Sequence, residues 1–200
     1  MDDTENMHAP PPLQALDRRR SVPSAQLGEP GPDDATVLRM LRSAVRVPDH
    51  GKLVPFRFLR IAGDARAALG RFLAERTLER DPNAPEAVVE KDRQRFSQAP
   101  LVVTVIARLQ PGHKVPEQEQ LLTAGCTCFA LLQAAQACGF GAQWLTAWMA
   151  YDEAVAARLG LAPDERIVGF IHIGTPRLEA PERERPDAAA LLTDWVDGDA

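Results

Sequence analysis

The most constraining feature of the sequence is a long apolar segment that leads into a glycine-rich turn, within residues 113–149. Residues 117–139 place apolar side chains on almost every side of a helix, and such a helix is usually buried in a domain core or a subunit interface. Thr123 and Gln133 are among several interruptions that exclude a membrane span. Gly139 stands where a helix end favours positive φ. We therefore predict a buried helix that ends there and on which the other elements pack.

The composition indicates a globular domain that does not act mainly on nucleic acid or in a membrane. The chain has 200 residues, 45% of them hydrophobic, and a net charge of −5, which allows a sizeable core and argues against nucleic acid as main partner. The first residues are acidic and polar, unlike a signal peptide, so we expect a cytoplasmic protein. The histidines are scattered, and Cys126, Cys128 and Cys138 lack metal or disulfide spacing, so we expect core thiols and no metal site.

Helical and extended patterns alternate along the chain, and this alternation predicts a layered α/β or α+β domain. The run at 101–107 is apolar on both faces, as in a central strand covered by helices. We expect a disordered lead over 1–17, which contains three consecutive prolines, and a single domain with a C-terminal arm over 18–200. The remaining predicted strands are 56–61, 142–148 and 165–174, and the remaining predicted helices are 34–45, 64–80, 86–97 and 152–160.

Two short segments carry polar groups suited to a ligand. Three arginines at 18–20 precede Ser21, which is either a solvated charge run or an anion site, because guanidinium and hydroxyl groups match phosphate oxygens. His50 lies in a proline-bracketed loop before a strand, where ligand contacts are common, although a histidine without a task is the alternative. Nucleophile, zinc-hydrolase and phosphate-loop motifs are missing, and the G-x-G at 139–141 follows a helix rather than a strand. A cofactor that brings its own reactivity fits this pattern.

Several segments in collinear order, spanning about residues 17–196, resemble the nitroreductase family. They are Arg19-Arg20-Ser21, RVPDHGKLVPFRF (46–58), APLVVTVIA (99–107), HKVPEQEQLLTAGC (113–126), ACGFGAQWLTAW (137–148), RIVGFIHIGTPRLEA (166–180) and a C-terminal L-T-D-W. The resemblance is closest to the small YdjA-like branch of FMN-dependent NAD(P)H nitroreductases. It implies an α+β fold, with helices wrapped around a central, mainly antiparallel sheet. It also implies an intertwined homodimer with two FMN sites at the subunit interface and C-terminal residues that reach the partner.

The resemblance also assigns roles to individual positions. The arginines and the serine match the first FMN contact motif, and the loop histidine matches a residue that contacts the flavin from the other subunit. The helix end matches a stretch assigned to the nicotinamide dinucleotide. The matching positions are Arg19, Arg20, Ser21, His50, Val54, Leu145, Thr146 and Ala147 for FMN, and Ala135, Gln136, Ala137, Cys138, Gly139 and Phe140 for NAD(P).

Two of these positions depart from the branch. Val54 stands where the branch has glutamine, and Leu145, Thr146 and Ala147 stand where it has Arg-Ser-Gly. Losing the arginine removes a charge-assisted hydrogen bond worth about 1.5–3 kcal/mol. FMN binding would weaken about tenfold to a hundredfold, unless another arginine such as Arg18 or Arg177 compensates.

The function that the resemblance implies is electron transfer from NAD(P)H through FMN to a small acceptor, such as a nitroaromatic or quinone-like compound. Trp144 and Trp148 are candidates for the wall of the substrate pocket, with core packing as the alternative. The polar helix at 86–97 is expected on the surface, as a lid that selects the acceptor. Two alternatives stay open: a non-catalytic flavin-binding dimer, which the departures suggest, and another flavin dehydrogenase or dehalogenase of the same fold.

Overall fold

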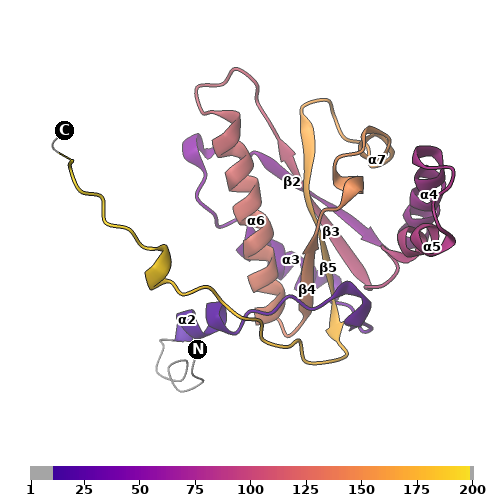
Figure 1. Ribbon diagram of the computed structural model, residues 1–200, viewed down its shortest axis with the longest axis horizontal. Coiled ribbons are helices and arrows are strands. Elements are labelled where there is room, and N and C mark those ends of the chain that lie inside the picture. The colour runs from indigo at the N-terminus through magenta and orange to yellow at the C-terminus, as the bar shows by residue number, and fades with distance from the viewer. Residues whose placement is uncertain (1–10, 199–200) are drawn as a thin grey trace.

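The structure, a computed structural model, describes residues 11–198 and has a five-stranded antiparallel sheet between two layers of helices (Figure 1). Strand β5 is central: β3 pairs with one of its edges, and β4 and the short β1 pair with the other. The other edge of β3 pairs with β2. The strands are β1 (Leu27–Gly28), β2 (Phe56–Ala62), β3 (Leu101–Arg108), β4 (Gly141–Leu145) and β5 (Glu165–Pro176).

Helices cover both faces of this sheet, so β3 is buried on both sides, as its apolar run predicts. Val103 and Val105 face α3 and α6, whereas Val102 faces the opposite layer. The α+β arrangement with a central antiparallel sheet is thereby confirmed. The helices are α2 (Pro11–Asp17), α3 (Asp34–Ala44), α4 (Asp64–Arg80), α5 (Glu86–Gln94), α6 (Glu117–Ala137) and α7 (Glu153–Arg158), with short 3-10 turns η1 (Ser24–Gln26), η2 (His50–Lys52), η3 (Trp148–Ala150) and η4 (Ala189–Leu191).

Helix α6 ends where the sequence predicts, and a glycine makes the end possible. Gly139 has φ of +83°, a conformation that favours glycine. The N–H of Phe140 donates to the Ala135 carbonyl and the N–H of Gly139 donates to the Gln136 carbonyl, both at 2.9 Å. These two bonds form a Schellman motif, which satisfies carbonyls that a helix end leaves unpaired.

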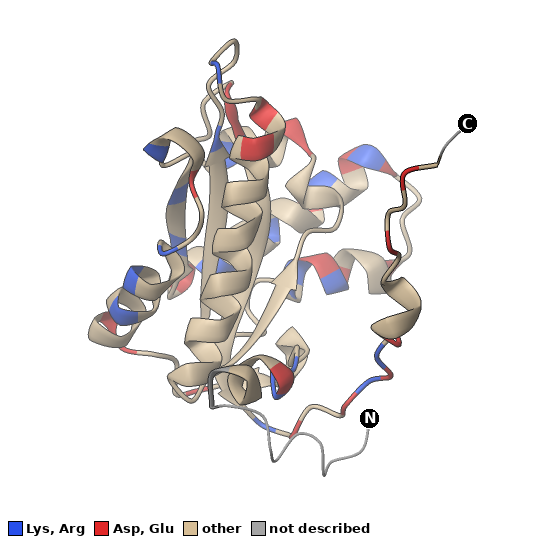
Figure 2. Cartoon of the chain, turned by 90° about the vertical axis from the view of Figure 1, so that its left-hand side faces the viewer, with Lys and Arg blue, Asp and Glu red and all other residues tan. Residues whose placement is uncertain are grey.

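One side of α6 is buried on the sheet and the other is apolar but exposed. Leu131 is fully buried, whereas Leu122 is 61% and Phe129 is 44% exposed. Cys128 is buried, and burial raises the pKa of its thiol to about 12, but Cys126 is exposed, so the expectation of core thiols is wrong for Cys126. Figure 2 shows that the outward side carries no charged residue along most of the helix.

The structure bears on two further predictions, the disordered lead and the polar helix at 86–97. Residues 1–10 of the predicted disordered lead lie outside the described residues, but Pro11–Asp17 forms α2, since proline is tolerated in a first helical turn. Helix α5 packs closely on α4, because Gly70 has no Cβ to collide with the Arg93 carbonyl. Most side chains of α5 are exposed, as predicted for a surface helix, whereas Asp92 is buried.

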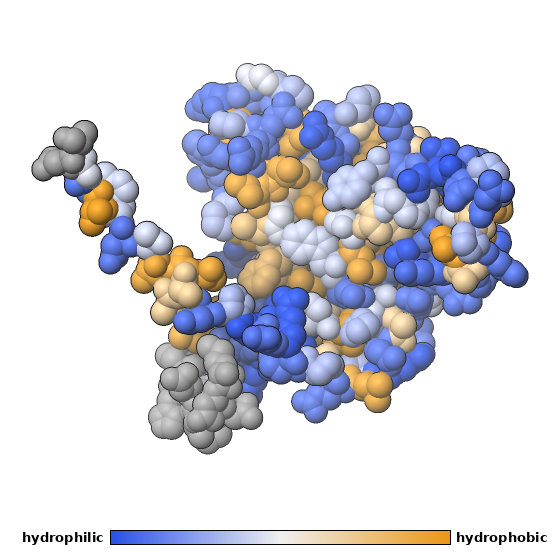
Figure 3. All heavy atoms as spheres, viewed as in Figure 1, coloured by the Kyte–Doolittle hydropathy of each residue, from blue (hydrophilic) through white to orange (hydrophobic). Residues whose placement is uncertain are grey.

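The chain leaves the body of the molecule after β5. Residues 177–198 run past the C-terminal end of α6 and then project away from it (Figure 1). Exposed apolar side chains lie along this projecting arm, as Figure 3 shows, and they include Leu191, Leu192, Trp195 and Val196. Within residues 11–198, no helix is both long enough and apolar enough to cross a membrane.

Candidate functional site

The predicted phosphate-binding segment forms an ordered turn between α2 and the sheet. A guanidinium N–H of Arg19 donates to the Ser21 hydroxyl at 3.2 Å. Arg20 donates from its backbone to the Gln136 side chain and from its guanidinium to the Asp17 carbonyl, and it forms an ion pair with Glu182. The segment is therefore anchored to the end of α6, and its guanidinium groups are concentrated in a small volume.

The positive charges that surround this segment affect the pKa of Arg19. Burial lowers the pKa of Arg19, and the positive charges of Arg185, Arg183 and Arg20 lower it further. Glu182 opposes this effect and also pairs with Arg185 at 2.8 Å. Glu182 thus offsets part of the positive charge around it, and the clustered guanidinium groups have the donor chemistry that an anionic ligand requires.

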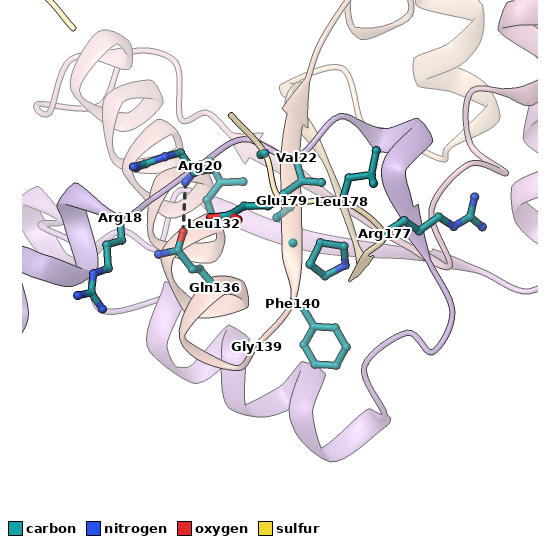
Figure 4. A pocket seen from close by; sticks show the side chains of 14 residues that line it. Arg18, Arg20, Val22, Leu132, Gln136, Gly139, Phe140, Arg177, Leu178 and Glu179 are labelled. Carbon is teal, nitrogen blue, oxygen red and sulfur yellow. Dashed lines mark hydrogen bonds between the residues drawn. The ribbon is translucent and has the colours of Figure 1, made fainter. Parts of the chain in front are cut away.

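A hollow of about 550 Å³ adjoins the segment (Figure 4). Arg20, Gln136 and Gly139 contribute to its wall, together with the start of β4 and the residues that follow β5. Arg18 and Arg177 lie on opposite sides of it in Figure 4. The hollow therefore brings one predicted FMN position, Arg20, together with predicted NAD(P) positions. Arg19, Ser21 and Leu145–Ala147 do not line it.

The predicted NAD(P) positions 135–140 form the end of α6 described above. Ala135 is buried, and the backbone groups of Cys138, Gly139 and Phe140 are used to end the helix. The Gln136 side chain accepts from the Arg20 N–H and donates to the Ala15 carbonyl. These hydrogen bonds end the helix and hold the arginine segment, and Gln136, Gly139 and Phe140 also line the hollow.

The second predicted FMN segment lies at the far end of β4. The N–H of Val22 donates to the Ala142 carbonyl, so the arginine segment runs alongside the start of β4. Leu145 follows three residues later, about 10 Å along the strand. Ala147, which replaces a family glycine, has φ of +51° and ψ of −171°, close to a region that is essentially confined to glycine.

The remaining FMN positions lie at the opposite end of α6. His50 is 65% exposed and its Nδ1 lies 2.7 Å from Glu119 in the first turn of α6. Val54 is 54% exposed with φ of +48°, an outlier for a β-branched residue. Its N–H donates to Asp49. Glu119 and Gln136 are about 25 Å apart along the helix, so one chain does not unite His50 with Arg20.

Other side chains near the predicted site were not foreseen from the sequence. The tail residues Glu182, Arg183 and Arg185 meet the arginine segment only because β5 returns the chain to it. Asp92 accepts hydrogen bonds from Thr77 and Trp148. A charged residue in a polar helix gave no signal for this burial. In the part of the chain that the structure describes, no group of His, Cys, Asp and Glu side chains is arranged to hold a metal ion.

Comparison with known proteins identifies the family. The model of the Nitroreductase family matches residues 16–175. A relative from Escherichia coli (strain K12), YdjA, is 34% identical over 182 residues, covering 90% of this chain and 97% of the relative. A relative from Haemophilus influenzae is 33% identical over 173 residues, covering 86% and 91%. Both carry the name "Putative NAD(P)H nitroreductase".

Solved structures show the same fold. A nitroreductase-like family protein from Bacillus cereus superposes with a TM-score of 0.78 at 19% identity, covering 95% of this chain and 98% of that one. A structure from Desulfovibrio desulfuricans, assigned as a nitroreductase and solved with FMN, has a TM-score of 0.73 at 22% identity, covering 95% and 99%. These likenesses confirm the expected fold, and the family match with the relatives above shows that the chain belongs to the nitroreductase family.

Proposed function

We propose that the protein is a cytoplasmic, homodimeric flavin oxidoreductase that uses FMN to pass electrons from NAD(P)H to a small acceptor, such as a nitroaromatic or quinone-like compound. Family membership supports the reaction class, and the names of the bacterial relatives support NAD(P)H as donor. The FMN bound to the similarly folded protein from Desulfovibrio desulfuricans supports the cofactor. The chain's own residues provide the remaining support.

The arginine segment has the donor chemistry that the FMN phosphate requires. A guanidinium N–H of Arg19 already donates to the Ser21 hydroxyl oxygen at 3.2 Å, which places the two groups side by side. The neighbouring Arg20, Arg183 and Arg185 add positive charge. A phosphate dianion is well matched by guanidinium forks and a hydroxyl. The phosphate end of FMN therefore fits the residues present, and Leu145 lies about 10 Å along β4 from Ala142, which accepts from the Val22 N–H.

The observation that carries the proposal is the separation of the predicted FMN positions to the two ends of α6. Between them runs the exposed apolar side of the helix, which includes Leu122 and Phe129. A second copy packed antiparallel on this side would bring its His50 to the Arg20 end of the first, and the reverse. Two-fold symmetry would then complete two equal sites while covering the apolar surface.

The projecting arm supports the same assembly. Leu191, Leu192 and Trp195 are all more than 70% exposed, and apolar side chains gathered on one segment indicate a contact surface. Because the arm leaves the body beside the arginine segment, it would lie on a partner close to the shared site.

In this assembly, the protein binds and orients while the cofactor carries the electrons. FMN, when bound, supplies electron transfer between NAD(P)H and the acceptor. Arg19, Arg20 and Ser21 would hold its phosphate, and the backbone at 145–147 would support its ring. His50 of a second copy would cover the ring, and the hollow beside Gln136 would admit the dinucleotide.

The test is the absorbance of the purified protein, before and after adding FMN. We expect a yellow flavin spectrum that bleaches when NADPH or NADH is added without oxygen, and turnover when a nitroaromatic or quinone follows. A colourless protein that takes up no added FMN would refute the proposal.

A non-catalytic flavin-binding dimer is the second candidate, because Val54 and Leu145 offer only apolar side chains where the branch has polar ones. It predicts bound FMN that NAD(P)H bleaches slowly or not at all, and no turnover with any acceptor. Rapid bleaching would exclude it. Bleaching followed by turnover on another oxidised substrate only would instead favour a flavin dehydrogenase of the same fold.

A further inference from the structure

The segment 145–147 is held in a conformation that its residues do not favour. Ala147 has φ of +51° and ψ of −171°, and its Cβ makes this region strained. Strained residues persist only where surrounding contacts fix them. The contacts on each side of this segment therefore show what stabilises it.

On the N-terminal side, Trp144 fixes the end of β4. Its indole N–H donates to the Val168 carbonyl at 3.2 Å, and the ring lies directly over Gly169. A Cβ added to Gly169 would meet the indole nitrogen at 2.0 Å, so this approach requires glycine. Trp144 is thereby fastened to β5 one residue before the segment begins.

On the C-terminal side, Trp148 fixes the start of η3. Its indole N–H donates to the Asp92 carboxylate at 3.1 Å, and Asp92 is only 2% exposed. The Arg80 guanidinium lies 4.3 Å from the centre of the indole ring. The next residue, Met149, is fully buried in the core. Trp148 is thereby fastened to α4 and α5 one residue after the segment ends.

We propose that Trp144 and Trp148 are positioning residues that hold Leu145–Ala147 in its strained shape from both ends. The backbone is then already formed for the flavin ring before the cofactor arrives, which reduces the ordering required on binding. This inference rests on the proposed function for its purpose, but the clamp itself is a property of the flavin-free chain. It assigns both tryptophans and the buried Asp92 to the support of the site rather than to the acceptor pocket.

The test compares hydrogen exchange of backbone amides 145–148 in flavin-free wild type and Trp148→Phe. The phenylalanine keeps an aromatic ring beside Arg80 but lacks the N–H donor. Losing a hydrogen bond to a carboxylate should speed local exchange about tenfold to a hundredfold. The dissociation constant for FMN should rise about threefold to tenfold, as the competent conformation is less populated. Adding Ala147→Gly to Trp148→Phe should restore most of both losses, because glycine removes the strain.

Thr77→Val is the matched control. It removes the other neutral donor to the same Asp92 oxygen without touching the segment. Its exchange at 145–148 should stay at the wild-type rate. Unchanged exchange in Trp148→Phe, or an equal increase in Thr77→Val, would overturn the clamp, as would faster exchange with unchanged FMN affinity. If wild type binds no FMN, the proposed function fails and the exchange data alone still decide whether the clamp exists.

Discussion

The two ends of helix α6 are built in opposite ways. At its C-terminal end, the Gln136 side chain bonds to the arginine segment and to α2, and the helix carbonyls are capped by the turn at Gly139. At its N-terminal end, His50 and Val54 are exposed, and Nδ1 of His50 lies 2.7 Å from the half-exposed Glu119. At the C-terminal end, the predicted ligand-binding residues are held by hydrogen bonds within their own chain. At the N-terminal end, the predicted ligand-binding residues are exposed.

This difference indicates which end depends on a second copy. The arginine segment has its internal partners and is expected to keep its shape in a monomer. Within the described residues, the His50 loop lies at the opposite end of α6 from Arg20. Two residues of this loop, Lys52 and Val54, have positive φ. Strain of this kind is common at functional sites.

The largest effect is expected from a charge placed on the apolar side of α6, between its two ends. This change tests whether a second copy packs there. In Phe129→Glu, an unpaired carboxylate would be buried in the proposed interface, at a cost of about 3–5 kcal/mol. Dimerisation should weaken by at least about a hundredfold, and FMN binding should fall with it. Light scattering after gel filtration, with an FMN titration at the same concentrations, measures both effects.

Val88→Glu is the control for that variant. Val88 is exposed to a similar extent, 43%, on α5 across the sheet, so this glutamate should leave assembly and FMN binding unchanged. A Phe129→Glu protein that stays dimeric would show that the apolar side of α6 is not the contact.

A subunit-mixing experiment tests whether Arg19 and His50 contribute to the same FMN site from different subunits. Arg19→Ala should weaken FMN binding about tenfold to a hundredfold, and His50→Ala should also weaken it. In a mixed dimer of the two variants, a site shared between subunits leaves one site doubly damaged and the other intact. In a randomly mixed one-to-one sample, about a quarter of all FMN sites should therefore bind FMN as the wild type does.

The mixing result has a clear contrary outcome. If Arg19 and His50 acted in the same chain's site, every site in the mixed dimer would carry one defect and nothing would be recovered. Arg71→Ala mixed with His50→Ala serves as control, because Arg71 is exposed on α4, far from the arginine segment. That mixture should recover about half of the wild-type sites in all, a quarter from mixed dimers and a quarter from Arg71→Ala homodimers.

Much of the fold could be predicted because local patterns and packing agree. The apolar run at 101–107 is a strand with both faces covered, and Gly139 ends its helix as expected. The polar pattern of α5 correctly predicts a surface helix, but it does not reveal that Asp92 is buried. Asp92 pairs locally with Arg95, but its other partners, Thr77 and Trp148, come from distant parts of the chain, which a local pattern does not reveal.

The site was predictable only where it is contiguous in sequence. Arg19, Arg20 and Ser21 stand together as a motif, and the structure keeps them together. The approach of Glu182 to Arg20 depends on the return of the chain after β5. The strain at Val54 depends on a backbone angle, which residue identity alone does not give. Both properties arise from tertiary structure.

A smaller effect tests the strain at the His50 end. Val54→Gly should raise the free energy of unfolding by about 1 kcal/mol, because relief of positive-φ strain exceeds the entropy cost of glycine. The midpoint of thermal unfolding of the flavin-free protein should rise by about 2–4 °C. Val45→Gly is the control, since Val45 is similarly exposed but has φ of −78°, and it should lower the midpoint. A similar loss in both variants would show that Val54 is not strained.

The smallest effect concerns the carboxylate at the opposite, arginine-rich end. Glu182 pairs with Arg20 and Arg185, so an incoming phosphate must compete with it for the same guanidinium groups. Glu182→Gln should strengthen FMN binding by about two- to fivefold, the range of a surface ion pair, and the gain should shrink at high salt. Glu184→Gln removes the same charge two residues away and should change affinity less. Equal gains from the two variants would indicate a general charge effect on the tail, whereas weaker binding in Glu182→Gln would mean that Glu182 positions Arg20 for the phosphate rather than competing with it.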